Sequence, residues 1–153
     1  MSEDETKDER LDRELIELLN ELRVALPGVQ MLFGFLLAVP FSQRFNTISV
    51  TQRHVYYATF LCTAFASIFF IAPTAYHRLR FRQRDKEQLV KTANVLAIVG
   101  TVFLALALSG AVFVVTDLVF KNTMTAVATG ATAALLAILW YGLPGLSRLR
   151  ESA

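Results

Sequence analysis

Residues 77–91 read HRLRFRQRDKEQLVK and separate two uncharged segments, 55–76 and 93–116. The stretch holds six of the fifteen Lys and Arg residues of the chain. Each neighbouring segment reaches the roughly 20 residues that an α-helix needs to cross a bilayer. A basic connection between two membrane-length segments marks the side on which it lies, because Lys and Arg are enriched in cytoplasmic loops. This stretch therefore decides the predicted topology.

Two further uncharged segments, 24–41 and 123–143, complete a set of four predicted membrane spans within 153 residues. The hydrophobic content of 54% exceeds the share that is usual in soluble proteins. A soluble helical bundle is the alternative, but it would have to bury four apolar helices on every side, and a chain of this length offers too little polar cover. We predict an all-α fold, an integral membrane four-helix bundle.

Basic residues near the ends of the spans predict the orientation. With both termini on one side, that side carries twelve Lys and Arg residues, and the opposite side carries three, Arg44, Arg53 and Lys121. The positive-inside rule places both termini, the basic connection and a C-terminal tail at 144–153 in the cytoplasm. The first residues are acidic, so no secretory signal peptide is expected.

The segment 8–23 follows a short tail, 1–7, that we expect to be disordered. Its apolar residues recur with the spacing of one helical face and are Leu11, Leu15, Ile16, Leu18, Leu19 and Leu22. The opposite face is more acidic than basic. These features predict an N-terminal amphipathic cytoplasmic helix, which ends in a kink or a restart at Pro27 and Gly28 because proline lacks a backbone donor.

The acidic face of this helix favours a partner of opposite charge. One hypothesis is that Glu14, Glu17 or Glu21 pairs with arginines of the basic connection, which are Arg78, Arg80, Arg82 and Arg84. The other is a solvated acidic face whose leucine stripe packs on the bundle or on a second subunit. His77 lies at the same rim of the membrane and is a further candidate functional residue, because imidazole titrates near neutral pH.

The predicted spans contain no ionisable side chain at mid-depth, where proton-coupled transporters place one. Gln30 and Asn94 are the candidate intramembrane polar sites, and the Thr and Ser residues of the spans are expected to hydrogen-bond within or between helices. At the outer rim, Asp117 is expected to pair with Lys121, four residues on.

The fourth predicted span carries a stripe of small residues that includes Ala126, Gly130 and Ala134. Such stripes let the backbones of two membrane helices approach closely. The stripe is expected to mediate packing, either within the chain or between copies.

No residue pattern predicts catalysis or cofactor binding. His54 and His77 fall on opposite sides of the membrane in this topology, and no Cys or carboxylate cluster joins them to a metal site. The chain has no phosphate-binding glycine loop and no nucleophile elbow. We expect no enzymatic activity, no metal and no cofactor. The basic connection is expected to contact anionic lipid, and no nucleic acid is expected as a partner.

A family resemblance rests on three stretches, ELRVALPGVQMLFGFLLAVPFSQRF at 21–45, IAPTAYHRLRFR at 71–82 and the residues around Asn94. With their Pro-Gly-x-Gln and Ala-Pro-x-x-Tyr-His-Arg elements, they resemble a family of small four-span bacterial membrane proteins, frequent in actinobacteria. That family has no established function, and its members are sometimes labelled sodium:proton antiporters. The resemblance implies a bacterial plasma-membrane location, and it carries over no catalytic residue.

The expected function is that of a non-enzymatic accessory or interaction subunit, with a membrane-protein partner or a second copy of the chain. The alternative is a small cation (sodium)/proton antiporter. Gln30 argues against this alternative, because similar-sized multidrug transporters carry a carboxylate in the first span and an amide cannot exchange a proton. The predicted functional surface is the cytoplasmic face, where the basic connection, the acidic helix and His77 meet.

Overall fold

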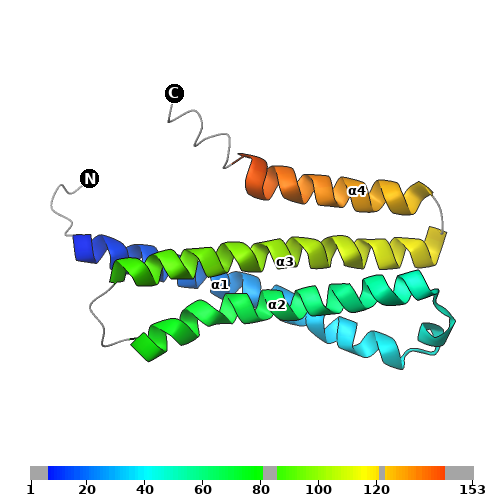
Figure 1. Ribbon diagram of the computed structural model, residues 1–153, viewed down its shortest axis with the longest axis horizontal. Helices are drawn as coiled ribbons and strands as arrows, with labels where there is room; N and C mark the ends of the chain where they lie inside the picture. Colours follow the sequence, from blue (N-terminus) through cyan, green and yellow to red (C-terminus); the bar gives the residue numbers. More distant parts are fainter. Residues whose placement is uncertain (1–6, 81–85, 121–122, 144–153) are drawn as a thin grey trace. The chain divides into compact units, whose positions relative to one another are not determined.

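Helices account for almost all of the chain that the computed structural model describes, which is residues 7–80, 86–120 and 123–143 (Figure 1). The four long helices are α1 (Lys7–Ala38), α2 (Val50–Arg80), α3 (Lys86–Phe120) and α4 (Thr123–Ala137). Two 3₁₀-helices, η1 (Val39–Phe41) and η2 (Gln43–Thr47), connect α1 to α2, and a π-helical turn, η3 (Ile138–Gly142), extends α4. The described residues contain no strand, so the predicted all-α four-helix class is confirmed.

Four helical segments are long and apolar enough to cross a membrane, and they are Glu9–Phe41, Val50–Tyr76, Glu87–Phe120 and Thr123–Gly142. Each of them overlaps one of the four predicted spans, and the first three begin earlier in the chain than predicted. At about 1.5 Å per residue, the 32 residues of α1 extend roughly 48 Å, whereas a hydrocarbon core is about 30 Å thick. The 31 residues of α2 and the 35 residues of α3 exceed it as well. The chain is a multi-pass membrane protein whose first three helices are longer than the bilayer core.

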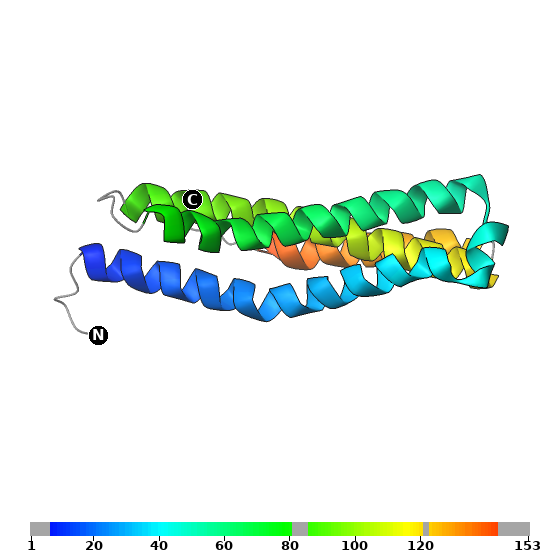
Figure 2. The same ribbon diagram turned by 90° about the horizontal axis from the view of Figure 1, so that it is seen from below.

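α1 joins the predicted amphipathic helix and the first span in one continuous helix, so the predicted restart at Pro27 and Gly28 does not occur. A buried stripe with seven-residue spacing runs through it and consists of Leu15, Leu22, Val29 and Leu36. A heptad spacing keeps one helix face toward its neighbours, and here it continues across Pro27. Ile16, predicted to share this face, is 59% exposed. Figure 2 shows a gentle bend about midway along α1, as expected where proline removes a hydrogen bond.

α2 is buried along one stripe from Gln52 to Pro73. The buried residues alternate between three- and four-residue spacing and are Gln52, Tyr56, Thr59, Thr63, Ala66, Phe70 and Pro73. This alternation is the pattern of helices that pack as in a coiled coil. The stripe includes polar residues, because Thr59 donates its hydroxyl to the carbonyl of Val55 in the preceding turn, 2.7 Å away.

The chain divides into two compact units. Unit 1 comprises Met1–Leu36 and Thr63–Phe103, and unit 2 comprises Leu37–Cys62 and Leu104–Ala153. In unit 1, α2 meets α3 at Gly100, where a Cβ would lie 2.5 Å from the ring of Phe70. In unit 2, the same two helices meet at Gly110, where a Cβ would collide with Oγ1 of Thr59. Glycine permits both approaches because it has no side chain.

α4 belongs to unit 2, and the face that it buries is not the predicted stripe of small residues. Ala126, Gly130 and Ala134 are exposed, and a Cβ at Gly130 would meet nothing within 4 Å. Thr125 is the buried residue of α4, with 4% exposure. The predicted packing stripe therefore makes no packing contact at Gly130 within the described part of unit 2.

Candidate functional site

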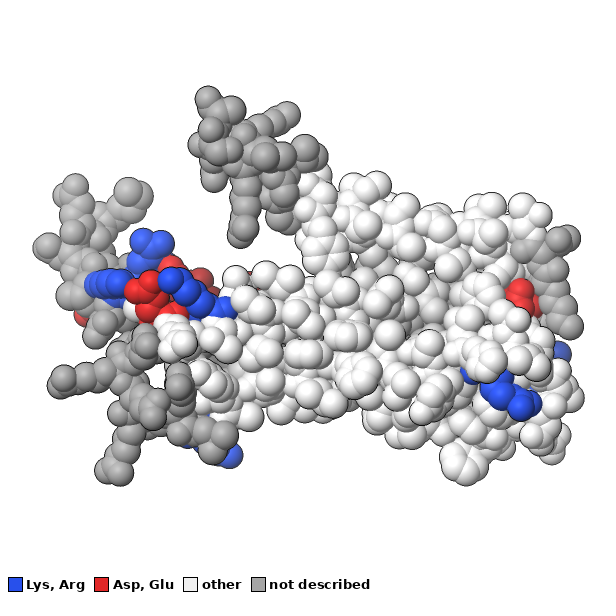
Figure 3. Space-filling view, viewed as in Figure 1, with Lys and Arg blue, Asp and Glu red and all other residues white. Residues whose placement is uncertain are grey.

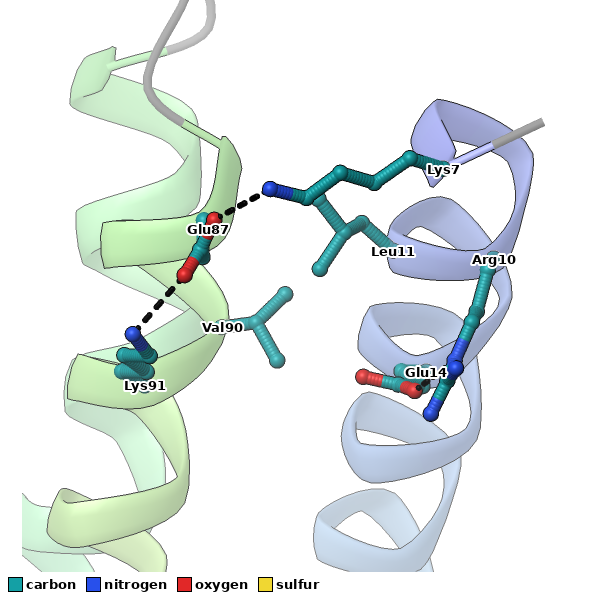
Figure 4. Close-up of a pocket in the computed structure, with 7 residues that line it drawn as sticks. All are labelled: Lys7, Arg10, Leu11, Glu14, Glu87, Val90 and Lys91. Carbon is teal, nitrogen blue, oxygen red and sulfur yellow. Dashed lines mark hydrogen bonds and ion pairs between the residues drawn. The ribbon is translucent and has the colours of Figure 1, made fainter.

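A network of ion pairs lies where α1 and α3 begin in unit 1, at what we call the Lys7 end (Figure 4). Nζ of Lys7 lies 2.7 Å from Oε2 of Glu87, and Nζ of Lys91 lies 2.8 Å from Oε1 of the same carboxylate. Within α1, Nε of Arg10 lies 2.9 Å from Oε1 of Glu14. The Lys7–Glu87 pair ties the first turn of α1 to the first turn of α3, across 80 residues of sequence.

The leucine stripe of α1 supports this contact between helices. Leu11 and Val90 point toward one another beside the ion pairs, in a cavity of about 260 Å³ (Figure 4). Leu15 and Leu22 follow along α1, each 7% exposed. Because these residues precede the uncharged segment 24–41, the removal of apolar surface from water contributes to their packing. The structure supports the hypothesis in which the stripe packs on the bundle.

Glu87 is a carboxylate shared between two ammonium groups. It precedes the uncharged segment 93–116 and therefore lies outside the membrane core. Hydrogen bonds from Lys7 and Lys91, together with their positive charge, lower the pKa of Glu87 to about 2, below the ordinary value of about 4.3. Its side chain is 45% exposed, so each ion pair by itself contributes little to stability. The charge on Glu87 is nevertheless held through the whole physiological range of pH.

A second cavity at the Lys7 end, which we call the acidic cavity, brings predicted site residues together. It has a volume of about 390 Å³ and is lined by Glu14, Glu17, Leu18, Glu21, Val90, Lys91 and Asn94. Glu17 and Glu21 are exposed, and neither forms an ion pair within the described residues. Lys91 is the only cation in this lining, and it already binds Glu87. The acidic cavity therefore carries a net negative charge.

The charged side chains of unit 1 are confined to one end of it. On the face drawn in Figure 3, blue and red atoms gather at the Lys7 end, a few further blue atoms lie below them, and white atoms cover the middle of the drawn surface. Gln30 is exposed on α1 and lines neither cavity at this end. The predicted intramembrane polar sites are thus separated, because Asn94 joins the acidic cavity and Gln30 does not.

The predicted pairing of the acidic face with the basic connection involves residues that are described only in part. Arg78 is exposed, and no ion pair joins it to the glutamates of α1 among the described residues. Arg82 and Arg84 lie outside the described residues, as do the side chains of Arg80 and His77, whose backbones belong to α2. The pairing with these residues stays a prediction.

Four residues of the network are absent from the predicted site, and they are Lys7, Arg10, Glu87 and Lys91. Glu87 and Lys91 lie four residues apart on one helix, and this spacing of opposite charges is itself a signal of an ion pair. Nothing in the spacing points to Lys7, because the contact joins two different helices. The sequence therefore contained a signal for the Glu87–Lys91 pair within α3, but none for the Lys7–Glu87 pair that joins α1 to α3.

Unit 2 carries a polar network at the junction of α2, α3 and α4. Ser49 and Gln52 form a capping box in which Oγ of Ser49 accepts the Gln52 N–H at 3.2 Å and Oε1 of Gln52 accepts the Ser49 N–H at 2.8 Å. Nε2 of Gln52 donates to Oδ2 of Asp117 at 2.7 Å, and the hydroxyl of Thr125 donates to Oδ1 at 3.4 Å. Asp117 thereby joins three helices. Its predicted partner, Lys121, lies outside the described residues.

The hydroxyls inside the spans bond mainly to their own helices. The donors and their carbonyl acceptors are Thr59 and Val55, Ser67 and Thr63, Thr101 and Ile98, Ser109 and Ala105, and Thr132 and Ala128. These bonds confirm the predicted role of the polar residues in the spans. Within the described ranges, the hydroxyl of Thr129 is buried without a partner. The same ranges contain no group of three His, Cys, Asp or Glu side chains that could hold a metal ion.

Of the comparisons with known proteins, one with a protein family gives a match, and it agrees with the predicted resemblance to a family without an established function. No curated protein and no solved structure matches the chain. A family model matches residues 4–144, a range that contains α1, α2, α3 and α4. The resemblance to a four-span family without an established function is confirmed to that extent. With four helices apolar enough to cross a membrane, this chain belongs to a family of unknown function, DUF6328.

Proposed function

We propose that the protein is a non-enzymatic accessory subunit of a membrane assembly and that its Lys7 end carries the surface for the partner. The observation that supports this proposal is that the charged residues lie outside the four uncharged segments. The four uncharged segments contain no Asp, Glu, Lys, Arg or His, whereas the acidic cavity presents Glu17 and Glu21 without an ion pair among the described residues. Proton-coupled transporters typically carry ionisable groups within the membrane along the path of the proton. An exposed charged surface instead suits recognition of a protein of opposite charge.

The charge distribution also supports an orientation. In this proposal the Lys7 end and both termini face the cytoplasm from the bacterial plasma membrane, because twelve basic residues fall on that side and three on the other. The partner is a membrane protein with a basic cytoplasmic surface, or a second copy that presents its own Lys and Arg residues. Either one complements the net negative charge of the acidic cavity.

Cross-linking in native membranes, followed by purification of the tagged full-length chain, tests the accessory role. We expect one membrane protein, or a second copy of the chain, to be recovered in a constant ratio to the tagged chain. The double change Glu17→Lys and Glu21→Lys is expected to lower its recovery at least about tenfold, because like charges across an interface cost several kcal/mol. The matched control is Arg53→Glu, which reverses an exposed charge in unit 2. Recovery of the wild-type chain alone, as a monomer, would contradict the proposal.

A second candidate function, small sodium/proton antiport, is favoured by the network around Asp117. This carboxylate accepts hydrogen bonds from residues of α2 and α4, and a titratable group held between helices is typical of proton-coupled transporters. Proteoliposomes with a pH gradient separate the two functions. The accessory role expects no sodium-dependent proton flux above that of empty liposomes. A flux that is abolished by Asp117→Asn, Glu21→Gln or His77→Gln, and retained by Arg53→Gln, would replace the accessory role with antiport.

A further inference from the structure

A cavity between α1 and α2 in unit 1 differs in character from the two at the Lys7 end. Its volume is about 300 Å³, and it is lined by Leu19, Asn20, Leu22, Arg23, Leu26, Phe70 and Thr74. Leucines and Phe70 form an apolar wall, and Phe70 is only 2% exposed because it packs against Gly100. Phe70, as part of this wall, is held by the contact between α2 and α3. The polar residues of the lining are Asn20, Arg23 and Thr74.

The polar side chains of this cavity have unused hydrogen-bonding capacity. Asn20, Arg23 and Thr74 form no side-chain hydrogen bond or ion pair with any described residue. The guanidinium of Arg23 presents several N–H donors in a planar fork that matches a phosphate. At the Lys7 end, by contrast, the cations that line the cavities are bound to carboxylates. The lining of the α1–α2 cavity holds one positive residue and no negative one.

The position of the cavity along the helices places it at the surface of the hydrocarbon core. Arg23 immediately precedes the uncharged segment 24–41, and Phe70 lies inside the uncharged segment 55–76. Six residues separate Phe70 from Tyr76 at the end of that segment, which is about 9 Å along a helix. Arg23 is thus at the level of the lipid headgroups, and Phe70 is at the level of the acyl chains.

A second arginine follows the cavity-lining residue Thr74 along α2. Arg78 is exposed and follows Thr74 by four residues, so the two occupy the same face of the helix one turn apart. It lies farther from the hydrocarbon core than Thr74, in the same direction as the basic connection. α1 and α2 therefore each carry an exposed arginine on the headgroup side of the hydrocarbon core.

We infer that this cavity binds one anionic phospholipid. The guanidinium of Arg23 donates to the phosphate, since a fork of N–H groups is suited to bidentate bonds with phosphate oxygens. Asn20 and Thr74 supply further bonds to the oxygens of the headgroup and glycerol. Leu22, Leu26 and Phe70 contact the upper part of an acyl chain. The unbalanced positive charge selects an anionic headgroup, and the apolar wall selects a lipid over a soluble phosphate.

Native mass spectrometry of the full-length protein, with lipids added to the detergent micelles, tests this site. We expect retention of one phosphatidylglycerol in preference to phosphatidylcholine. Arg23→Gln is expected to weaken that retention about tenfold, because it removes a charge-assisted hydrogen bond. Arg53→Gln removes the same charge from an exposed position in unit 2 and is expected to leave retention unchanged. Equal retention of the two lipids, or equal losses in the two variants, would overturn the inference.

Filling the apolar part of the cavity distinguishes a lipid from a free phosphate. Leu26→Trp keeps Arg23 and occupies the space for the acyl chain, so it is expected to lower phosphatidylglycerol retention. Leu26→Phe gives the same test with less added volume if the Trp variant loses its helix content. Undiminished retention in a folded filled variant would refute a role for the chain. Displacement of the lipid by inorganic phosphate at matched concentration would assign the site to soluble phosphate instead.

Discussion

Replacing Gly100 by Ala is expected to destabilise unit 1, and replacing Gly130 by Ala is expected not to destabilise unit 2. An added Cβ at position 100 would lie 2.5 Å from Cδ1 and Cε1 of Phe70 and 3.3 Å from Cβ of Phe69. Carbon atoms in contact are about 3.5–4.0 Å apart, so the ring has to move by roughly 1 Å. Phe70 is 2% exposed. The ring has little room except toward the cavity of about 300 Å³ between α1 and α2, so either the ring shifts into that cavity in another rotamer or the helices separate.

The expected magnitude follows from two opposing effects. One excess methyl group in a packed core costs about 1–3 kcal/mol, and two ring atoms in collision place this site in the upper part of that range. Ala in place of Gly in a helix interior stabilises by about 1 kcal/mol. The net loss for Gly100→Ala is about 1–2 kcal/mol. At Gly130 a Cβ would meet nothing within 4 Å, so only the gain in helix propensity remains.

Equilibrium unfolding of the full-length protein in mixed micelles with increasing SDS, followed by far-UV circular dichroism, measures both variants. Gly100→Ala is expected to unfold at a lower SDS fraction than the wild type, and Gly130→Ala at an equal or higher one. Adding Phe70→Leu to Gly100→Ala tests the cause, because a smaller side chain vacates the space of the ring and the double-mutant cycle isolates the pair. Equal stability of the Gly100 and Gly130 variants would refute the reasoning.

Three further predictions concern the polar contacts. The pKa of Glu87 is lowered to about 2, so its ion pairs are complete above about pH 4.3 and are lost as the pH falls through about 2. Hydrogen-exchange protection of the first turns of α1, corrected for intrinsic rates, is expected to fall as the pH is lowered over this range. At neutral pH the same protection is expected to be lower in Glu87→Gln than in the wild type, and unchanged in Glu17→Gln. Unchanged protection at both ends of the range would contradict this. Asp117→Ala leaves the amide of Gln52, 3% exposed, without its acceptor and is expected to lower the free energy of unfolding in mixed micelles by about 1–3 kcal/mol. Asp117→Asn retains an acceptor oxygen and is expected to lose less, so equal losses would rule out this bond. Ser49→Ala removes the acceptor of the capping box and is expected to cost about 1 kcal/mol in the same assay; a stability equal to that of the wild type would show that the box does not hold α2.

The positions of the four helices were predictable because the cost of placing charge in hydrocarbon is a local property of the chain. An uncharged run such as 93–116 is recognisable whatever its neighbours are. Of the two outcomes predicted at Pro27, a kink or a restart, the restart does not occur and α1 bends instead (Figure 2), because the local loss of one hydrogen bond is not the whole balance. The heptad stripe before and after Pro27, with Leu22 and Val29 at 7% and 1% exposure, packs on neighbouring helices and keeps α1 continuous.

The sequence by itself determined that four uncharged segments can cross a membrane and which ends carry charge, whereas the structure set the bounds of the helices, such as the start of α3 at Lys86. The tertiary structure decided which faces meet. Gly100 and Gly130 both lie within uncharged helical segments, yet Gly100 meets Phe70 and Gly130 meets open space. Glu87 has one partner 80 residues away in the chain, Lys7, and Asp117 has one 65 residues away, Gln52. Such contacts depend on the rotation and register of one helix against another, and these are set jointly by all the side chains at the interface, so no single stretch of sequence contains them.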